Sequence, residues 1–407
     1  MNRQRIQADA AATKATLLSV SALTVLSSMT LSPDLPAIRE HFRAVPDADT
    51  LVRLVLTLHA LFIVLGAPLA GYVVDRFGRT RVLLLAALAY GLTGSAGALL
   101  DGLPALLASR ALLGLATAGT MTGATTLIAD YYTGKTRAQM AAWQAAAMNF
   151  GGVGATLASG VLAGLSWRLP FLIYLVGLVL VVPIVATLVE PAREVPALGA
   201  SPLRAGAPSA GRAPVGTLLA IYGIMSAMML LFFVVPVQLP FYLRGALHVG
   251  AAQSGVALAA PNLCTGLVAL AYGRLARRFD RLRLIALGFA GLGGGLLVVG
   301  VAPSYLPVVA GTFLAGAVQG VVLPTLGLWI MAVTPLAARG RALSGLTASI
   351  FAGQFLSPFV SQPLARAVGL AALFPVTGAV ALAVALAVAL RQRQAMVAEA
   401  RIKLMNG

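Results

Sequence analysis

Long apolar runs alternate with short polar segments along the whole chain. A helix needs about 20 apolar residues to cross the hydrocarbon core of a bilayer, and each run approaches or exceeds that length. We interpret the first run as a retained span rather than a signal peptide, because it is long and lacks a small-residue cleavage site. The pattern predicts twelve membrane-spanning helices, at residues 16–38, 52–74, 82–100, 105–128, 139–163, 169–190, 215–242, 251–273, 284–302, 305–333, 342–364 and 368–390.

A polar segment at residues 191–214 separates the sixth run from the seventh. It is rich in Pro, Gly, Ala and Ser and contains three arginines, a composition typical of a flexible linker. The predicted organisation is therefore an N-terminal six-helix bundle (residues 1–190), a cytoplasmic linker (191–214), and a C-terminal six-helix bundle with a short cytoplasmic tail (215–407).

The basic residues follow the loops. Twelve spans place both termini on one side, and 22 of the 29 Lys and Arg residues fall on that side, against six on the other and Arg110 within the fourth span. This asymmetry indicates that both termini are cytoplasmic. The net charge of +17 thus reflects membrane topology, and we expect no nucleic-acid partner.

Composition excludes a soluble enzyme. The chain is 59% apolar and 10% charged, whereas soluble domains have about 25% charged residues. The single Cys264 allows neither an intrachain disulfide nor a thiolate metal cluster. The sequence has no phosphate-binding loop and no zinc-binding His-Glu-x-x-His motif. We therefore expect no enzymatic activity, no metal and no cofactor.

The two halves repeat at an offset of 202 residues. The segment 71–81 aligns with 273–283, and further pairs at the same offset are Gly114 with Gly316, Arg137 with Arg339, and Gly151 with Gly353. Parallel repeats of six spans are a recurrent transporter architecture, so the sequence predicts two pseudo-symmetric bundles.

The loop after the second span resembles the best-known signature of the major facilitator superfamily, Gly-x-x-x-Asp-[Arg/Lys]-x-Gly-Arg-[Arg/Lys]. Thr80 departs from the last basic position, and Arg81 follows it. Helix 4 carries Arg110-x-x-x-Gly114, similar to a second family signature. Ser32-Pro33-Asp34-Leu35-Pro36 is similar to an element of the twelve-helix drug/proton antiporters. The matching residues of the first signature are Gly71, Asp75, Arg76, Gly78 and Arg79.

The resemblance implies an all-α integral membrane protein that transports a small molecule by alternating access, driven by a proton gradient in a bacterial-type inner membrane. We expect export of lipophilic or amphipathic molecules, with protons and membrane lipids as the other partners and a monomer as the working unit. Helix 5 departs from the antiporter pattern at Phe150, Ala155 and Ala158–Ser159. A polar metabolite, a metallophore or a lipid is therefore an alternative cargo, and a non-transporting receptor is a further alternative.

The signature loop is a candidate cytoplasmic gate. Asp75 follows helix 2 and is expected to lie at the positive N-terminal end of helix 11, which would favour the outward-open state. The predicted gate comprises Gly71, Asp75, Arg76, Gly78, Arg79 and Arg81. Alternatively, the loop only orients the protein through its arginines.

Asp34 is the one acid well inside an apolar span, and ionisable groups in such positions usually have a function. Arg110 is expected at a similar depth, so we predict an ion pair that switches with conformation and carries the proton. Alternatively, Asp34 caps an outer loop. His59 suits proton relay, although a lone histidine more often bonds a neighbouring helix.

The remaining candidates are apolar or neutral polar side chains inside spans, expected to line a substrate cavity. Helix 7 presents Met and aromatic residues on one face, which indicates either a cavity wall or ordinary packing. The polar groups either orient substrate or bond across helices. The candidates are Thr24, Ser27, Gly114, Thr117, Met121, Gln144, Asn149, Tyr222, Met225, Met229, Phe232, Gln319 and Gln354.

Overall fold

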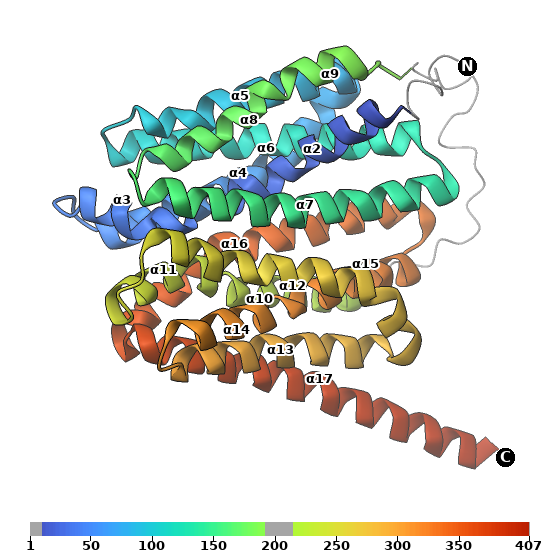
Figure 1. The fold of residues 1–407 in the computed structure, drawn as a ribbon. Coiled ribbons are helices and arrows are strands. Elements are labelled where there is room, and N and C mark those ends of the chain that lie inside the picture. The colour runs from blue at the N-terminus through green and yellow to red at the C-terminus, as the bar shows by residue number, and fades with distance from the viewer. Residues whose placement is uncertain (1–9, 192–214, 407) are drawn as a thin grey trace.

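A computed structural model describes residues 10–191 and 215–406 (Figure 1). These residues form helices joined by short turns, without a strand. The 3-10 helices are η1 (Ser32–Asp34), η2 (Ala96–Ala98), η3 (Leu169–Leu175) and η4 (Leu336–Ala338). The α-helices are α2 (Ala11–Met29), α3 (Leu35–His41), α4 (Ala48–Phe77), α5 (Arg79–Ser95), α6 (Leu103–Tyr131), α7 (Gly134–Ala163), α8 (Val176–Val179), α9 (Val181–Thr187), α10 (Val215–Phe232), α11 (Val234–Ala246), α12 (Ala251–Arg278), α13 (Arg281–Val301), α14 (Tyr305–Ala315), α15 (Ala317–Val333), α16 (Arg339–Val368) and α17 (Leu370–Asn406).

Within the described residues, twelve helical segments are long and apolar enough to cross a membrane, as the sequence predicts. Their ends extend past the apolar runs where charged residues continue a helix, for example at Arg76 in α4 and Arg277 in α12. The predicted linker at 191–214 lies outside the described residues apart from Pro191. Six spans precede it and six follow it.

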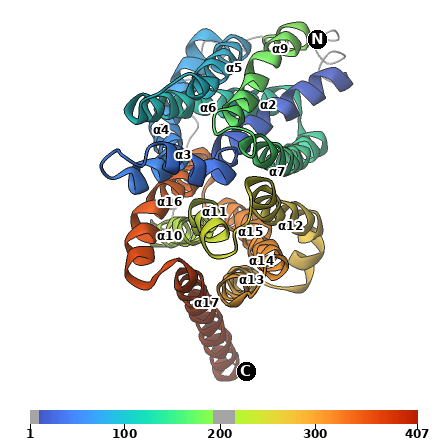
Figure 2. The same ribbon diagram turned by 60° about the vertical axis from the view of Figure 1, so that its left-hand side comes forward.

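The spans form two bundles, which lie one above the other in both views (Figures 1 and 2). We call the bundle of α2–α9 the N half and the bundle of α10–α17 the C half. The linker end is the end at which α9 finishes and α10 starts. The far end is the opposite end, where α3 and α11 lie side by side (Figure 1).

Close backbone contacts follow the 202-residue repeat. A Cβ built on Gly114 of α6 would collide with the backbone oxygen of His59 in α4. A Cβ on Gly316, which separates α14 from α15, would collide with the backbone oxygen of Pro261 in α12. Both pairs are related by the same offset, so the two bundles are pseudo-symmetric in packing as well as in sequence.

The first span is not one continuous helix. α2 ends at Met29, η1 covers Ser32–Asp34, and α3 begins at Leu35. Pro33 and Pro36 lie in the first turns of η1 and α3. Proline has no backbone N–H group. The first turn of a helix does not need this group, but the interior of a longer helix does, so the two prolines interrupt the span. Asp34 is therefore not part of the regular helix that carries Thr24 and Ser27.

The two halves touch in the middle and at the far end, and they separate toward the linker end. Gly160 of α7 packs against Gly255 of α12 so closely that a Cβ on Gly160 would lie 2.9 Å from the Gly255 Cα. Gly273 lies about five turns after Gly255 on the same face of α12. A Cβ there would meet nothing within 4 Å, and the same holds for Gly71 of α4. The molecule is therefore closed at the far end and open toward the linker end.

We predict that Gly160→Val shifts the protein toward a state that is open at the far end. The added side chain would overlap the backbone of Ala251 and Gly255, and overpacking of this kind costs about 1–3 kcal/mol. Gly154→Val is the matched control on the same helix, because a Cβ at Gly154 meets nothing within 4 Å.

The measurement is the distance between spin labels at Gly102→Cys and Ser304→Cys, which are exposed far-end positions in opposite halves. The Cys264→Ser background removes the one native thiol. The distance should lengthen in Gly160→Val and stay unchanged in Gly154→Val. Equal distances in both variants would show that this helix contact does not hold the far end closed.

Candidate substrate pathway and gates

A buried arginine of the N half is bound by the C half at the far end. Arg53 of α4 is 4% exposed, and its Nε donates to Oε1 of Gln238 in α11 over 3.0 Å. Its guanidinium lies over the ring of Phe241, 4.0 Å from the centroid. Gln238 in turn donates to Ser361 and Gln362 of α16. This network joins three spans and closes the far end with charge-assisted hydrogen bonds.

A second buried polar cluster lies at the contact of α4 with α16. Gln354 Nε2 lies 3.2 Å from Ser28 Oγ and 3.3 Å from His59 Nε2, and Ser28 Oγ is 3.1 Å from the same ring nitrogen. An amide nitrogen only donates, so His59 Nε2 is an acceptor. In this conformation His59 bonds neighbouring helices, which is the alternative to relay. The relay role stays a prediction.

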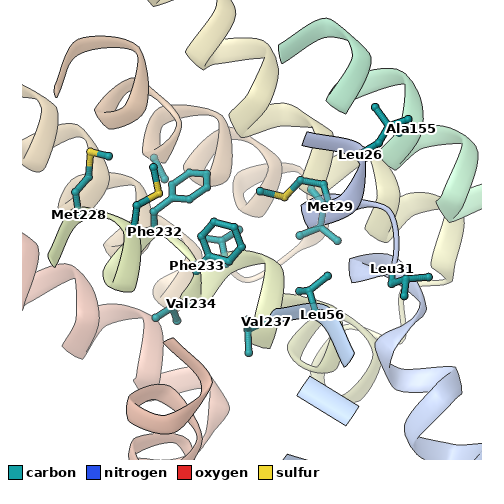
Figure 3. Close-up of a cluster of buried hydrophobic side chains, with 14 of the residues drawn as sticks. Leu26, Met29, Leu31, Leu56, Ala155, Met228, Phe232, Phe233, Val234 and Val237 are labelled. Carbon is teal, nitrogen blue, oxygen red and sulfur yellow. The ribbon is translucent and has the colours of Figure 1, made fainter. Parts of the chain in front are cut away.

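Apolar side chains from both halves fill the space beside these polar clusters. Figure 3 shows them in one group, with α2, α4 and α7 contributing from one side and α10 and α11 from the other. They exclude water from the path toward the far end. The labelled members are Leu26, Met29, Leu31, Leu56, Ala155, Met228, Phe232, Phe233, Val234 and Val237.

The Met and aromatic face of the seventh span, α10, is packed against other helices in this conformation. Met225, Met229 and Phe232 are at most 4% exposed. A Cβ on Gly353 would lie 2.8 Å from the Met229 Cβ, so this face lies against α16. Tyr222, nearer the linker end, is half-buried and donates to the backbone oxygen of Ala342. The cavity-wall interpretation stays a prediction for other conformations.

Asp34 lies at the contact between the halves, beside the far-end closure. It is fully buried, and neither carboxyl oxygen has a hydrogen-bond partner within the described part of the chain. Its element, η1, packs against α7 of the N half and against α11 and α12 of the C half. A cavity of about 500 Å³ next to it is lined by Pro33 on one side and by Arg244 and His248 on the other.

The predicted ion pair between Asp34 and Arg110 is not formed in this conformation. Arg110 Nη2 donates to the backbone oxygens of Thr93 (3.1 Å) and Gly94 (2.6 Å). Its guanidinium also lies over the rings of Phe171 and Tyr174. Arg110 thus holds α5 and η3 within the N half, whereas Asp34 lies in η1 at the contact between the halves.

The signature loop at the linker end is bound by two acids that the sequence pattern did not reveal. Gly78 has a φ of +100°, which only glycine adopts readily. The Glu190 carboxylate accepts from the backbone nitrogens of Arg79 (2.7 Å) and Thr80 (2.8 Å), the first residues of α5. Arg79 Nε also lies 2.9 Å from Oδ2 of Asp130. Both acids follow or end a span on the arginine-rich side, which is the signal that could have found them.

The other predicted gate residues are accessible. Asp75, Arg76 and Arg81 are exposed, and Gly71 is half-buried beside open space. This agrees with the separation of the halves at the linker end. The predicted contact of Asp75 with the start of α16 belongs to the opposite conformation and stays a prediction.

Several predicted cavity residues satisfy their own helix. Ser27 donates to the Thr24 backbone oxygen, Thr117 to Leu113, and Asn149 to Ala145. A side-chain donor that is bound to its own helix is not available to donate that hydrogen bond to a substrate. Gly114 serves the close contact with α4, and Met121 and Gln319 are half-buried on α6 and α15.

Three other polar side chains lie at contacts between helices or are buried without a partner among the described residues. Gln144 bridges α7 to α2, with Nε2 3.0 Å from Ser21 Oγ. Thr24 Oγ1 and Asn262 Nδ2 are buried without a partner among the described residues. A Cβ on Gly152 would lie 3.8 Å from the Asn262 side chain, which places Asn262 at the contact of α12 with α7.

Two six-helix bundles that touch at one end and separate at the other are the arrangement of transporters that work by alternating access. The family model of the Major Facilitator Superfamily matches residues 17–238 and 221–401. The chain belongs to this superfamily. No curated protein matches it.

Solved structures of the same fold include the D-xylose-proton symporter, with a TM-score of 0.77 and 18% identity over 93% of this chain and 96% of that one. A bacterial homolog of the human lysosomal transporter Spinster, inward-facing and unoccupied, has a TM-score of 0.74 and 19% identity over 95% and 96%. The human organic anion transporter MFSD10 (TETRAN) has a TM-score of 0.69 and 20% identity over 93% and 100%. At these identities the likeness shows the fold.

We predict that Gln238→Leu weakens the far-end closure by about 1–3 kcal/mol, because it leaves the buried Arg53 without its side-chain acceptor. Ser361→Ala is the control, since it keeps the Gln238 acceptor for Arg53. Ser254→Cys reports the effect: Ser254 is 3% exposed and lines the far-end cavity beside Asp34. A membrane-impermeant maleimide should label it several-fold faster in Gln238→Leu. Equal labelling in both variants would contradict the role of this network.

Proposed function

We propose that the protein is a proton-coupled exporter of lipophilic or amphipathic small molecules in a bacterial-type inner membrane. The excess of basic residues on the linker side supports a cytoplasmic location for that end. The conformation described above is then open to the cytoplasm and closed to the outside. The exporter works as a monomer on the proton gradient, without a bound cofactor.

The observation that carries this proposal is the isolated burial of Asp34. An ionised carboxylate without a partner is strongly destabilising in a protein interior. The closed far end therefore favours a neutral Asp34. When the halves separate there, water reaches the carboxyl group and ionisation becomes favourable. Protonation from the outside would then promote closure, which is the coupling that an antiporter requires.

The proton must also leave toward the cytoplasm. Ser28, His59 and Gln354 form the buried polar cluster at the contact of the halves, and we assign to them the route from the far-end region to the linker side. Arg110 has no part in this step, since it is committed to α5 and η3. It positions α6 instead.

The lining of the path supports a weakly polar cargo. The candidate binding atoms, Thr24 Oγ1, Asn262 Nδ2 and the Gln144 amide, are neutral. Apolar side chains such as Met29 and Phe233 surround the path at its closed end (Figure 3). Few neutral polar groups among many apolar ones suit an amphipathic molecule better than a sugar, which needs a dense set of hydrogen bonds.

We predict that Asp34→Asn abolishes substrate-driven proton flux while the protein still folds. The amide is close in size to the carboxyl group but cannot carry a proton. Proteoliposomes with an internal pH dye, under an imposed proton gradient, would be challenged with lipophilic cations and neutral drugs.

Asp47→Asn is the matched control. Asp47 is exposed at the same end, and its positive φ of 56° suits asparagine as well as aspartate. Its flux should equal the wild-type flux. Normal flux in Asp34→Asn would defeat the assignment of the proton carrier. Absence of flux with every compound in folded wild-type protein would favour a polar or lipid cargo.

A further inference from the structure

A second far-end cavity, of about 400 Å³, has a strongly basic lining. The N half contributes Arg39 and Arg53 and the C half contributes Arg244 and Arg366. Two acids, Glu40 and Asp49, also line it. The lining therefore carries two more positive than negative charges. Arg244 also lines the cavity beside Asp34, so the two far-end cavities share part of their walls.

The two acids are already shared among the arginines of the N half. Asp49 Oδ1 lies 3.0 Å from Arg39 Nε and 4.0 Å from Arg53 Nη1. Glu40 is bound by Arg43 at 3.1 Å, outside the cavity. Arg39 and Arg366 both lie close enough to Arg53 to repel its guanidinium. The positive charge of the cavity is thus incompletely compensated from within.

Two arginines of the C half are available to a ligand. Neither Arg244 nor Arg366 forms an ion pair with any residue that the structure describes, yet both face the cavity. Arg53 is held behind them by Gln238 and by stacking on Phe241. Guanidinium groups bind carboxylate and phosphate with paired, charge-assisted hydrogen bonds.

We propose that this cavity binds an anion, a carboxylate or phosphate group, and that the bound anion holds the far end closed. The walls come from both halves, so the complete site exists only in the closed state. A ligand that binds one state better shifts the population toward that state by its differential affinity. The inference goes beyond the proposed export function and holds for any cargo.

The anion has two sources with the same chemistry. A free anion in solution would reach the cavity from the far side of the membrane. The headgroup of an anionic lipid would reach it from the outer leaflet. The test therefore has one arm for each source.

In the first arm, thermal unfolding of the detergent-purified protein is followed with increasing inorganic phosphate, at ionic strength held constant with sodium chloride. The wild-type Tm should rise with phosphate. Arg244→Gln and Arg366→Gln should each weaken the apparent affinity about tenfold, the value for one charge-assisted hydrogen bond. Arg366→Lys restores the charge and should recover part of the response.

The second arm uses nanodiscs with and without phosphatidylglycerol and follows the distance between spin labels at Gly102→Cys and Ser304→Cys in the Cys264→Ser background. The anionic lipid should shorten this far-end distance in the wild type but not in Arg244→Gln. A response to the lipid but not to phosphate identifies a lipid headgroup, and the reverse identifies a free anion.

Arg168→Gln is the matched control for both arms. Arg168 pairs with Asp101 at the same end, and neither residue lines the cavity, so the change removes the same charge and leaves the cavity lining intact. It should respond like the wild type. The proposal is overturned if neither phosphate nor phosphatidylglycerol acts, or if both act equally on all the folded variants.

Discussion

The contact between the two halves at the far end depends on one electrostatic requirement: a charge removed from water must be compensated where it is buried. Arg53 meets the requirement through Gln238, the Asp49 backbone oxygen and the ring of Phe241. Asp34 does not meet it through any described partner. In the proposed mechanism the closed end therefore accommodates the arginine as an ion but favours the neutral form of the aspartate. This difference would turn the packing contact into a conformational switch.

The rest of the fold keeps the two halves rigid so that the contact can act as a unit. Within the N half, Arg110 ties α6 to α5, and Glu190 ties the end of α9 to the start of α5. Glycines allow the helices of each half to approach at backbone distance, as at Gly114 and Gly316. Movement is then concentrated at the contact between halves, where Gly160 meets Gly255 at one end and Gly71 faces open space at the other.

The architecture could be predicted from the sequence because its determinants are local or repeated. Apolar runs specify the spans, and the 202-residue offset specifies two similar bundles. The repeat even pairs the close contacts at Gly114 and Gly316. Both features can be recognised in the sequence without knowing which spans are neighbours in the structure.

The site was less predictable because its partners are distant in the chain. Arg53 and Gln238 are 185 residues apart, and Glu190 and Arg79 are 111 apart. The ion pair between Asp34 and Arg110 was predicted from their similar depth, and depth does not specify the direction of a side chain. Arg110 bonds to α5 instead, and that partner depends on tertiary contacts.

The most direct test of the switch is the far-end distance between spin labels at Gly102→Cys and Ser304→Cys, measured from about pH 8 to about pH 5 in the wild type and in Asp34→Asn. In the proposed switch the far end closes when Asp34 is neutral, so acidification should favour closure. His248 lines the neighbouring cavity with Arg244, so His248→Gln is the control.

The account predicts that the far end closes as the pH falls in the wild type and in His248→Gln, and that Asp34→Asn is closed at every pH. A pH response that survives in Asp34→Asn, or a wild type without any response, would contradict it.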